Sequence, residues 1–321
     1  MPPIAFRTAI RDALDEELAF DERVILFGED IAAAGGVFAT TPGLYEKYGP
    51  QRVFDTPISE LALAGAAFGS AVTGLRPVVE IMFGDFLTLA MDTVVNQATK
   101  YWFLTGEQVS VPLVFRSVVG AGGRFGAIHS QMPASWFMGV PGLKIVAPST
   151  PADAKALLKA AVRDDNPVLF FEHKRLYGVE GEVNGAVGKL GEANVVREGS
   201  DITVVTAMKS VHDALAAAER LDGDGISVEV IDLRTLRPID VETILISVRK
   251  TNRIVVVEEG PLTGGWAGEV LACVTEQALG YLDDAWRIAT PNTPIPYSPP
   301  LEDAFLPGTD RIVAEIQRRL R

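Results

Sequence analysis

Glu60 is the first residue whose surroundings suit acid–base chemistry. It follows a predicted strand at residues 53–55 and directly precedes residues 61–75, an uncharged run rich in Ala and Gly. In parallel α/β sheets, ligands bind where strands end, and apolar surroundings bring a carboxyl group closer to proton exchange at neutral pH. The alternative is that helix polarity alone favours an acidic residue in a first turn, with Ser59 as the cap.

A second candidate is the glycine-rich segment 120–131, which follows another predicted strand and carries His129. Its four glycines allow the backbone to approach a ligand closely, and an imidazole transfers protons at physiological pH. It is not a phosphate-binding loop, because no Gly-Lys-Ser/Thr follows. The alternative is a surface loop with a solvated histidine. His173 ends a strand and could merely cap it, and His212 lies in a polar helical turn.

The elements that would position these residues alternate between strand and helix. β-branched runs predict strands at 24–27, 53–55, 78–83, 112–118, 144–146 and 168–171, and apolar spacing predicts helices at 61–75, 86–104 and 152–163. Later strands are predicted at 202–205, 227–231, 254–257 and 287–289, with helices at 211–221, 241–250, 267–282 and 310–320. Thr150, Pro151 and Asp153 form a typical helix start.

This alternation is typical of parallel sheets that are covered by helices on both faces. The pattern lapses in a Gly-rich, charged stretch after residue 174 and resumes near residue 200. We therefore predict an α/β protein with two doubly wound domains at residues 1–178 and 200–321, joined by a linker at 179–199. A length of 321 residues accommodates two such domains.

The amino-acid composition indicates which kinds of partner the protein can bind and in which cellular compartment it is found. A net charge of −13, from 42 acidic and 29 basic residues, repels phosphate backbones and argues against nucleic acid. The longest uncharged run, residues 61–75, is too short to span a bilayer and indicates a buried helix, so no membrane association is expected. One cysteine, Cys273, excludes an internal disulfide. Since the N-terminus lacks a secretory apolar core, we expect a cytoplasmic protein.

Several segments together resemble one family in order along nearly the whole chain. They are GEDI (28–31), GGVF (35–38), RVFDTPISE (52–60), GLRPVVEIMFGDF (74–86), IHSQ (128–131), PGLKIVAPSTPADAK (141–155) and VVVEEGPLTGG (255–265). The family is the beta subunit of the decarboxylating component of 2-oxoacid dehydrogenase complexes, including pyruvate, branched-chain and acetoin dehydrogenases. The resemblance implies a transketolase-like pyrimidine-binding domain followed by a transketolase-like C-terminal domain.

The resemblance also implies thiamin diphosphate bound between this chain and an alpha subunit in an alpha2-beta2 heterotetramer. The alpha subunit would hold magnesium and the diphosphate, so this chain would be active only with its partner. Glu60 would share a proton with the pyrimidine ring of the cofactor, with Phe86 against that ring and Ile58 and Met82 nearby. His129 would face the reacting carbon and aid acyl transfer to a lipoyl group. The second domain would dock a basic domain of the acyltransferase core, which the acidic balance suits.

Two segments match ion-binding positions of known proteins, and we interpret them differently. Some family members bind structural potassium at positions that match Leu113, Ala161, Val162, Asp164 and Asn166. The alternative there is a plain helix C-terminus followed by turn residues. Gly223-Asp224-Gly225, with Asn252 after it, matches the start of a magnesium–diphosphate signature. It lies between a predicted helix and a strand rather than before a helix, so we interpret it as a tight turn.

Pyruvate is the first choice of 2-oxoacid, followed by acetoin and branched-chain 2-oxoacids, because pockets discriminate weakly between neighbouring chain lengths. Ile128 replaces a Gln that many members carry before the histidine, which leaves the substrate open. Two rival classes remain. A self-sufficient transketolase-like enzyme would need a diphosphate-binding half that these residues lack. A catalytically silent assembly protein would not need both Glu60 and His129.

Overall fold

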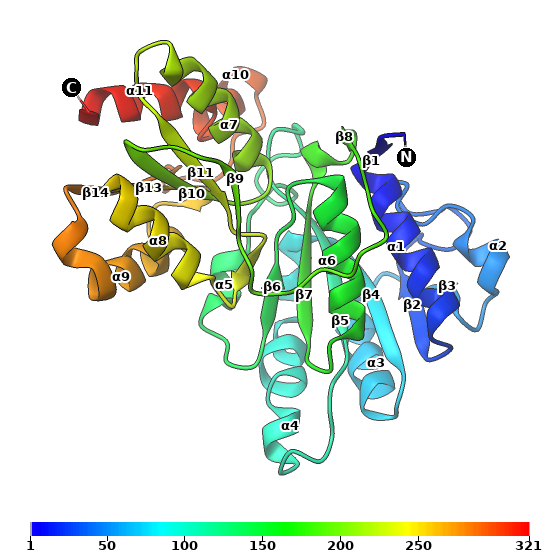
Figure 1. The fold of residues 1–321 in the computed structure, drawn as a ribbon. Coiled ribbons are helices and arrows are strands. Elements are labelled where there is room, and N and C mark those ends of the chain that lie inside the picture. The colour runs from blue at the N-terminus through cyan, green and yellow to red at the C-terminus, as the bar shows by residue number, and fades with distance from the viewer. Residues whose placement is uncertain (1, 321) are drawn as a thin grey trace.

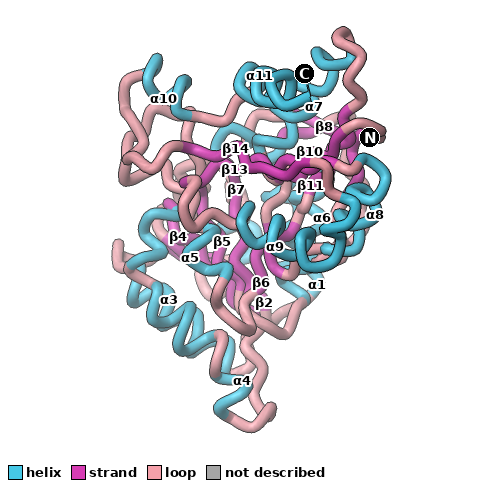
Figure 2. Tube along the Cα trace, turned by 90° about the vertical axis from the view of Figure 1, so that its left-hand side faces the viewer, coloured by secondary structure: helices cyan, strands magenta, loops and turns pink. Residues whose placement is uncertain are grey.

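The computed structural model describes residues 2–320, and its first sheet has seven strands in the order β12-β6-β7-β5-β4-β2-β3 (Figure 1). The parallel strands are β2 (Val24–Gly28), β3 (Val53–Asp55), β4 (Arg76–Phe83), β5 (Val114–Val119), β6 (Lys144–Val146) and β7 (Val168–His173). Helices α1 (Phe6–Phe20) and α6 (Pro151–Arg163) pack together on one face, and α3 (Glu60–Val72) lies on the other (Figure 2). Strands β2, β5 and β7 are buried along their whole length, as a parallel sheet covered on both faces requires.

The second sheet has five strands in the order β14-β13-β10-β11-β9. They are β9 (Asn194–Arg197), which is antiparallel, and the parallel strands β10 (Ile202–Thr206), β11 (Val228–Asp232), β13 (Arg253–Pro261) and β14 (Asp284–Thr290). Helices α7 (Lys209–Asp222) and α11 (Thr309–Leu320) cover one face, and α8 (Val241–Thr251) and α9 (Ala267–Ala278) cover the other (Figure 1). The predicted α/β class with two doubly wound units is confirmed.

Short elements complete the chain. They are β1 (Ile4–Ala5), α2 (Leu44–Tyr48), α4 (Tyr101–Leu104), α5 (Ala134–Met138), β8 (Glu180–Gly181), β12 (Thr235–Arg237) and α10 (Pro299–Phe305). No helix in residues 2–320 combines the length and the apolar character that crossing a membrane requires.

The single helix predicted over residues 86–104 is wrong. The structure has a 3-10 turn at Gly84–Thr88, a π-helical turn at Thr93–Ala98 and only then α4. The hydroxyl of Thr99 and the ammonium of Lys100 both donate to the carbonyl of Val95, at 2.7 Å each. Side chains thus replace regular backbone partners and interrupt the helix.

The two helix caps predicted from sequence have different outcomes. The hydroxyl of Thr150 accepts a hydrogen bond from the backbone N–H of Asp153 at 3.1 Å, so this helix start is confirmed. Ser59 precedes α3, but its side chain makes no capping hydrogen bond within the described part of the chain. The start of α3 is therefore set by other contacts, among them the burial of Glu60.

The two halves share one core. β12 comes from the second half of the chain but pairs antiparallel with β6 of the first sheet, and the amide of Ala147 donates to the carbonyl of Arg234 at 2.8 Å. Buried side chains of α8 and α9, such as Leu245 and Val270, belong to the same apolar cluster as the first sheet. The predicted domain and linker limits stay a prediction.

Candidate active site

Glu60 is the first residue of α3 and is only 7% exposed. Glu29, which follows β2, is also buried, and its Oε1 has no hydrogen-bond partner among residues 2–320. Burial, and then the neighbouring charge of Glu60, raise the pKa of Glu29. Glu29 therefore favours its protonated form, and it lies close enough to Glu60 for the charge of Glu60 to contribute.

The outer face of α3 is apolar and uncovered, so the helix predicted as buried is buried on its inner face only. Leu61 is exposed at the helix start, and Ile58, in the preceding loop, is 80% exposed. A cavity of about 270 Å³ opens beside them, lined by Phe27, Phe54, Thr56, Pro57, Ser59, Ala62, Leu63, Ala66 and Ser70. Glu60 is thus the first residue of a helix whose inner face is packed against the sheet. The outer face of this helix offers apolar surface to a ligand or another chain.

Phe83, the last residue of β4, organises the rings around His129. The His129 ring lies edge-on to Phe83 at 4.8 Å and to Phe86 at 5.4 Å between centroids. Met82 precedes Phe83 in the strand and is half-buried. The structure therefore brings together His129 and Phe86. Glu60 lies instead near Glu29, whose pKa its charge raises, and within residues 2–320 no hydrogen bond or ring contact joins Glu60 to His129 or Phe86.

The segment 120–131 forms a closed loop (the His129 loop below). The amide of Gly120 donates to the carbonyl of Gln131 at 3.3 Å and closes its base. The ammonium of Lys174 donates to the carbonyl of His129 and lies 4.8 Å from the ring centroid of Phe125. Burial lowers the pKa of Lys174 to about 8. The loop is thus held by specific contacts, with His129 half-buried, while Phe125 and Ile128 remain exposed.

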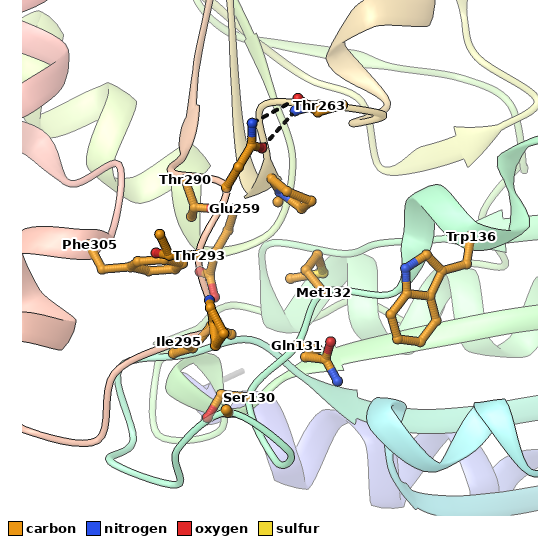
Figure 3. Close-up of a pocket in the computed structure, with 15 residues that line it drawn as sticks. Ser130, Gln131, Met132, Trp136, Glu259, Thr263, Thr290, Thr293, Ile295 and Phe305 are labelled. Carbon is orange, nitrogen blue, oxygen red and sulfur yellow. Dashed lines mark hydrogen bonds between the residues drawn. The ribbon is translucent and has the colours of Figure 1, made fainter.

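A larger cavity, of about 620 Å³, lies between this loop and the second domain (Figure 3). Ser130 and Gln131 line it from the loop, and Glu259 and Thr290 line it from the second sheet. On the side of the second sheet, the amide of Thr263 donates to the side-chain oxygen of Asn292 at 3.1 Å. The buried hydroxyl oxygen of Ser130 has no partner among residues 2–320. This cavity offers space and polar groups at the two residues that follow His129.

The residues of the predicted potassium site lie together at the C-terminus of α6. Arg76 donates to the carbonyls of Val162 and Asp164, both at 3.1 Å, and Lys144 donates to the Asp164 carboxylate. The carbonyl of Leu113 accepts a hydrogen bond from the amide of Val168, and the carbonyl of Ala161 accepts one from the amide of Asp164. Asn166 donates to the side chain of Asp164. Two cationic side chains thus occupy the oxygens that an ion would use, so the residues as arranged do not fit potassium, whose site stays a prediction.

Gly223-Asp224-Gly225 lies between α7 and β11, and Gly225 has a φ of 76°. Asn252 ends α8 in the left-handed conformation. The interpretation as a turn thus agrees with the structure. Among the described residues, no group of three or more His, Cys, Asp or Glu side chains is arranged to hold a metal ion.

Four residues that sequence reasoning missed belong to this region: Phe83, Lys174, Glu259 and Glu302. Phe83 and Glu259 fall inside the family-like segments 74–86 and 255–265, which offered a signal. Lys174 follows the strand that ends at His173. Nothing local distinguishes Glu302, because its role depends on contacts with residues more than half the chain away.

Two α/β units in this order, with a buried glutamate opening a helix of the first, define a transketolase-like protein. Residues 2–180 match the family described as transketolase, pyrimidine binding domain, and residues 191–312 match transketolase, C-terminal domain. A solved structure described as a split gene transketolase, inactive beta4 tetramer, has a TM-score of 0.82 at 24% identity and covers 98% of both chains. It supports the fold.

Three curated relatives are more similar in sequence. The chain is 45% identical to the acetoin:2,6-dichlorophenolindophenol oxidoreductase subunit beta of Cupriavidus necator and to the 2-oxoisovalerate dehydrogenase subunit beta of Bacillus subtilis, covering 99% of this chain and 98% of each relative. It is 43% identical to the pyruvate dehydrogenase E1 component subunit beta of Rickettsia conorii, covering 98% of both. The chain belongs to the family of E1 beta subunits of thiamin-diphosphate-dependent 2-oxoacid dehydrogenases.

Proposed function

We propose that this chain is the beta subunit of a pyruvate dehydrogenase decarboxylating component and acts only with an alpha subunit. The observation that carries the proposal is the burial of Glu60 at the start of α3, directly beside an uncovered apolar surface. A carboxyl group so placed is suited to meet a ring nitrogen that approaches from outside the chain. The relatives at 43–45% identity support the same reaction class.

Thiamin diphosphate would supply the carbon nucleophile and the electron sink that decarboxylation of a 2-oxoacid needs. The residues fit its pyrimidine half. Glu60 would hold a proton at the ring nitrogen, and the adjacent carboxyl of Glu29 favours keeping a proton in this region. Phe86 would lie against the ring, with Ile58 and Met82 as apolar neighbours.

His129 would orient and protonate groups at the reacting carbon during acyl transfer to a lipoyl group. Its ring direction is fixed by Phe83 and Phe86, and its backbone by Lys174. Preorganised donors of this kind stabilise a developing charge without reorganising at the moment of reaction. The cavity of about 620 Å³ beside the His129 loop gives the substrate and the lipoyl arm room to approach.

We propose that an alpha subunit covers the outer face of α3 and supplies the magnesium and diphosphate site, in an alpha2-beta2 heterotetramer. Exposed apolar side chains such as Leu61 and Ile58 support a protein partner there. The acyltransferase core and its lipoyl domain are the further partners, and the net charge of −13 suits a basic docking domain. A single cysteine supports a cytoplasmic location.

The test is to purify the chain with the alpha subunit that co-purifies and to assay pyruvate, acetoin and a branched-chain 2-oxoacid with and without thiamin diphosphate and magnesium. Turnover of pyruvate that requires the cofactor and the second chain supports the proposal. Preferential turnover of another substrate would change the substrate but keep the class. Activity of the chain alone would contradict the dependence on an alpha subunit.

The variant Glu60→Gln tests the mechanism in the same complex. We expect loss of cofactor-dependent decarboxylation, with the heterotetramer still formed. Glu242→Gln is the matched control, because Glu242 is an exposed glutamate in the first turn of α8. Unchanged activity of Glu60→Gln would contradict the role proposed for this residue and would favour the silent assembly protein.

A further inference from the structure

Two carboxylates of the second domain, the fully buried Glu302 and the largely buried Glu259, hold the His129 loop of the first. We propose that Glu259 and Glu302 are positioning residues that set the place of His129 through the backbone of this loop. The inference rests on the proposed function, in which His129 acts at the reacting carbon. Its structural part, the restraint of the loop, can be measured without turnover.

Glu302 provides the more extensive of the two restraints. It lies in α10 and its side chain is 0% exposed. Its carboxylate accepts hydrogen bonds from the amides of Gly122 at 2.8 Å and Arg124 at 3.2 Å, and from the Arg124 guanidinium at 2.6 Å. A buried carboxylate that is satisfied by three donors on one short segment fixes that segment, because losing any donor leaves the buried carboxylate short of a hydrogen bond.

Glu259 holds the base of the loop. One carboxylate oxygen accepts a hydrogen bond from the amide of Ala121, and the other lies 2.9 Å from Nε2 of His173. Burial works against its charge, but His173 and the amide of Ala121 outweigh burial and lower the pKa of Glu259. Gly120 packs so closely on His173 that a Cβ there would lie 2.2 Å from Nε2. The start of the loop is thus held between β7 and β13.

The loop needs such external restraint because its backbone is strained. Gly120, Gly122 and Gly126 have φ values of 90°, 85° and 74°, and Arg124 has a φ of 63° although it is not a glycine. Glycines adopt such φ values without strain, so the strain lies at Arg124, and a non-glycine residue keeps this conformation only where surrounding contacts impose it. At Arg124 these contacts come from Glu302, which binds both its amide and its side chain.

The restraint reaches His129 over a short path. Phe125 directly follows Arg124 and lies 6.1 Å from Phe83, the ring that also contacts His129. The amide of His129 meets the carbonyl of Gly126 at 3.5 Å, and the base of the loop closes between Gly120 and Gln131. Figure 3 shows Glu259 facing the same cavity as Ser130 and Gln131, the two residues after His129. A displacement at residues 121–124 would therefore move His129.

Asp303 offers a matched comparison. It binds the same Arg124 guanidinium, at 2.7 Å and 2.9 Å, but its side chain is 61% exposed and contacts no loop amide. An exposed ion pair contributes little. The variant Asp303→Asn therefore removes one carboxylate next to Glu302 and leaves the backbone restraint intact.

The experiment compares Glu302→Gln, Glu259→Gln and Asp303→Asn in the complex with its alpha subunit. Hydrogen exchange of the peptide that covers residues 120–131, and trypsin cleavage after Arg124, report on the loop. We expect faster exchange and faster cleavage in Glu302→Gln and Glu259→Gln. The same two variants should lose on the order of tenfold in kcat, with the KM for thiamin diphosphate unchanged because Glu60 lies outside the loop. Asp303→Asn should match the wild type within about twofold in both readouts.

The outcomes separate the inference from the function on which it rests. Unchanged exchange in both buried-site variants would overturn the restraint. A loosened loop with unchanged kcat would support the restraint and contradict the role of His129. Glu302→Asp keeps the charge and shortens the side chain, so it should recover part of the protection that Glu302→Gln loses. If all three buried-site variants failed to fold, the contacts would serve stability alone and the inference would be overturned.

Discussion

The ring of His129 meets the ring of Phe83 edge-on, with 4.8 Å between centroids and 87° between planes. On another side Phe38 meets Phe83 in the same manner, at 5.7 Å and 87°. Edge-to-face pairs have a preferred geometry that aliphatic side chains do not impose. The buried end of β4 thus sets the direction of the imidazole.

Replacing Phe83 by Leu should therefore lower kcat about tenfold while costing at most about 1.5 kcal/mol of stability. Steady-state kinetics and urea unfolding of the complex measure the two effects. Phe38→Leu is the control, because it removes a ring from Phe83 without touching His129. Equal kcat losses in both variants would show that packing, and not the His129 contact, is responsible.

Stability should fall as the pH rises from about 4.5 to about 7, and Glu258 should account for part of this fall. Burial raises the pKa of Glu258 from 4.5 to about 7. Between these values the folded chain binds the proton that the unfolded chain has released, so raising the pH favours unfolding. Above pH 7 this contribution is constant.

Glu258→Gln should remove that slope and raise the free energy of unfolding at pH 8 by up to about 3 kcal/mol. The glutamine oxygen can still accept from the amide of Ala267, which Glu258 binds at 3.2 Å. Chemical unfolding at pH 5 and pH 8 is the measurement, with the exposed Glu269→Gln on α9 as control. A slope that survives in Glu258→Gln would have to come from other groups.

A fragment of residues 1–190 should not fold by itself. Without β12, the edge of β6 is unpaired, and without α8 and α9 the shared apolar cluster loses a side. We expect aggregation and binding of a hydrophobic dye, and recovery of a soluble species when residues 191–321 are co-expressed. A monomeric fragment with a cooperative unfolding transition would contradict this expectation.

Potassium should leave the melting temperature of the wild-type chain unchanged relative to sodium at equal ionic strength. Arg76 and Lys144 already supply positive charge to Val162 and Asp164, so an ion would have to displace them. Arg76→Gln should make the melting temperature potassium-dependent, since it frees two carbonyl oxygens. A wild-type chain that melts higher in potassium would instead support the predicted ion site.

Much of the fold can be predicted from local sequence patterns. β3 and β6 begin and end at the predicted residues, because short β-branched runs between turns leave little choice. Helix α1 was missed although Phe6, Ile10, Leu14 and Leu18 have helical spacing and are buried. β12 was missed because its pairing depends on β6, a strand of the other half of the chain.

The candidate site could be predicted only in part from the sequence. Glu60 and His129 lie in segments that resemble a known family, and the structure places them at a helix start and in a held loop. The partner of Arg124 was not predictable, because Glu302 lies 178 residues further along the chain and many exposed acidic residues are equivalent in sequence. Choosing among them requires knowing which segments fold side by side.

The pairing of β12 with β6 also limits which recombined genes would encode a folded protein. A recombination event in the stretch between the two sheets would join a first half to a foreign second half. The foreign strand would then have to match the edge of β6, and foreign glutamates would have to meet the amides of residues 121–124. The two halves are therefore expected to be exchanged among genes as a single unit.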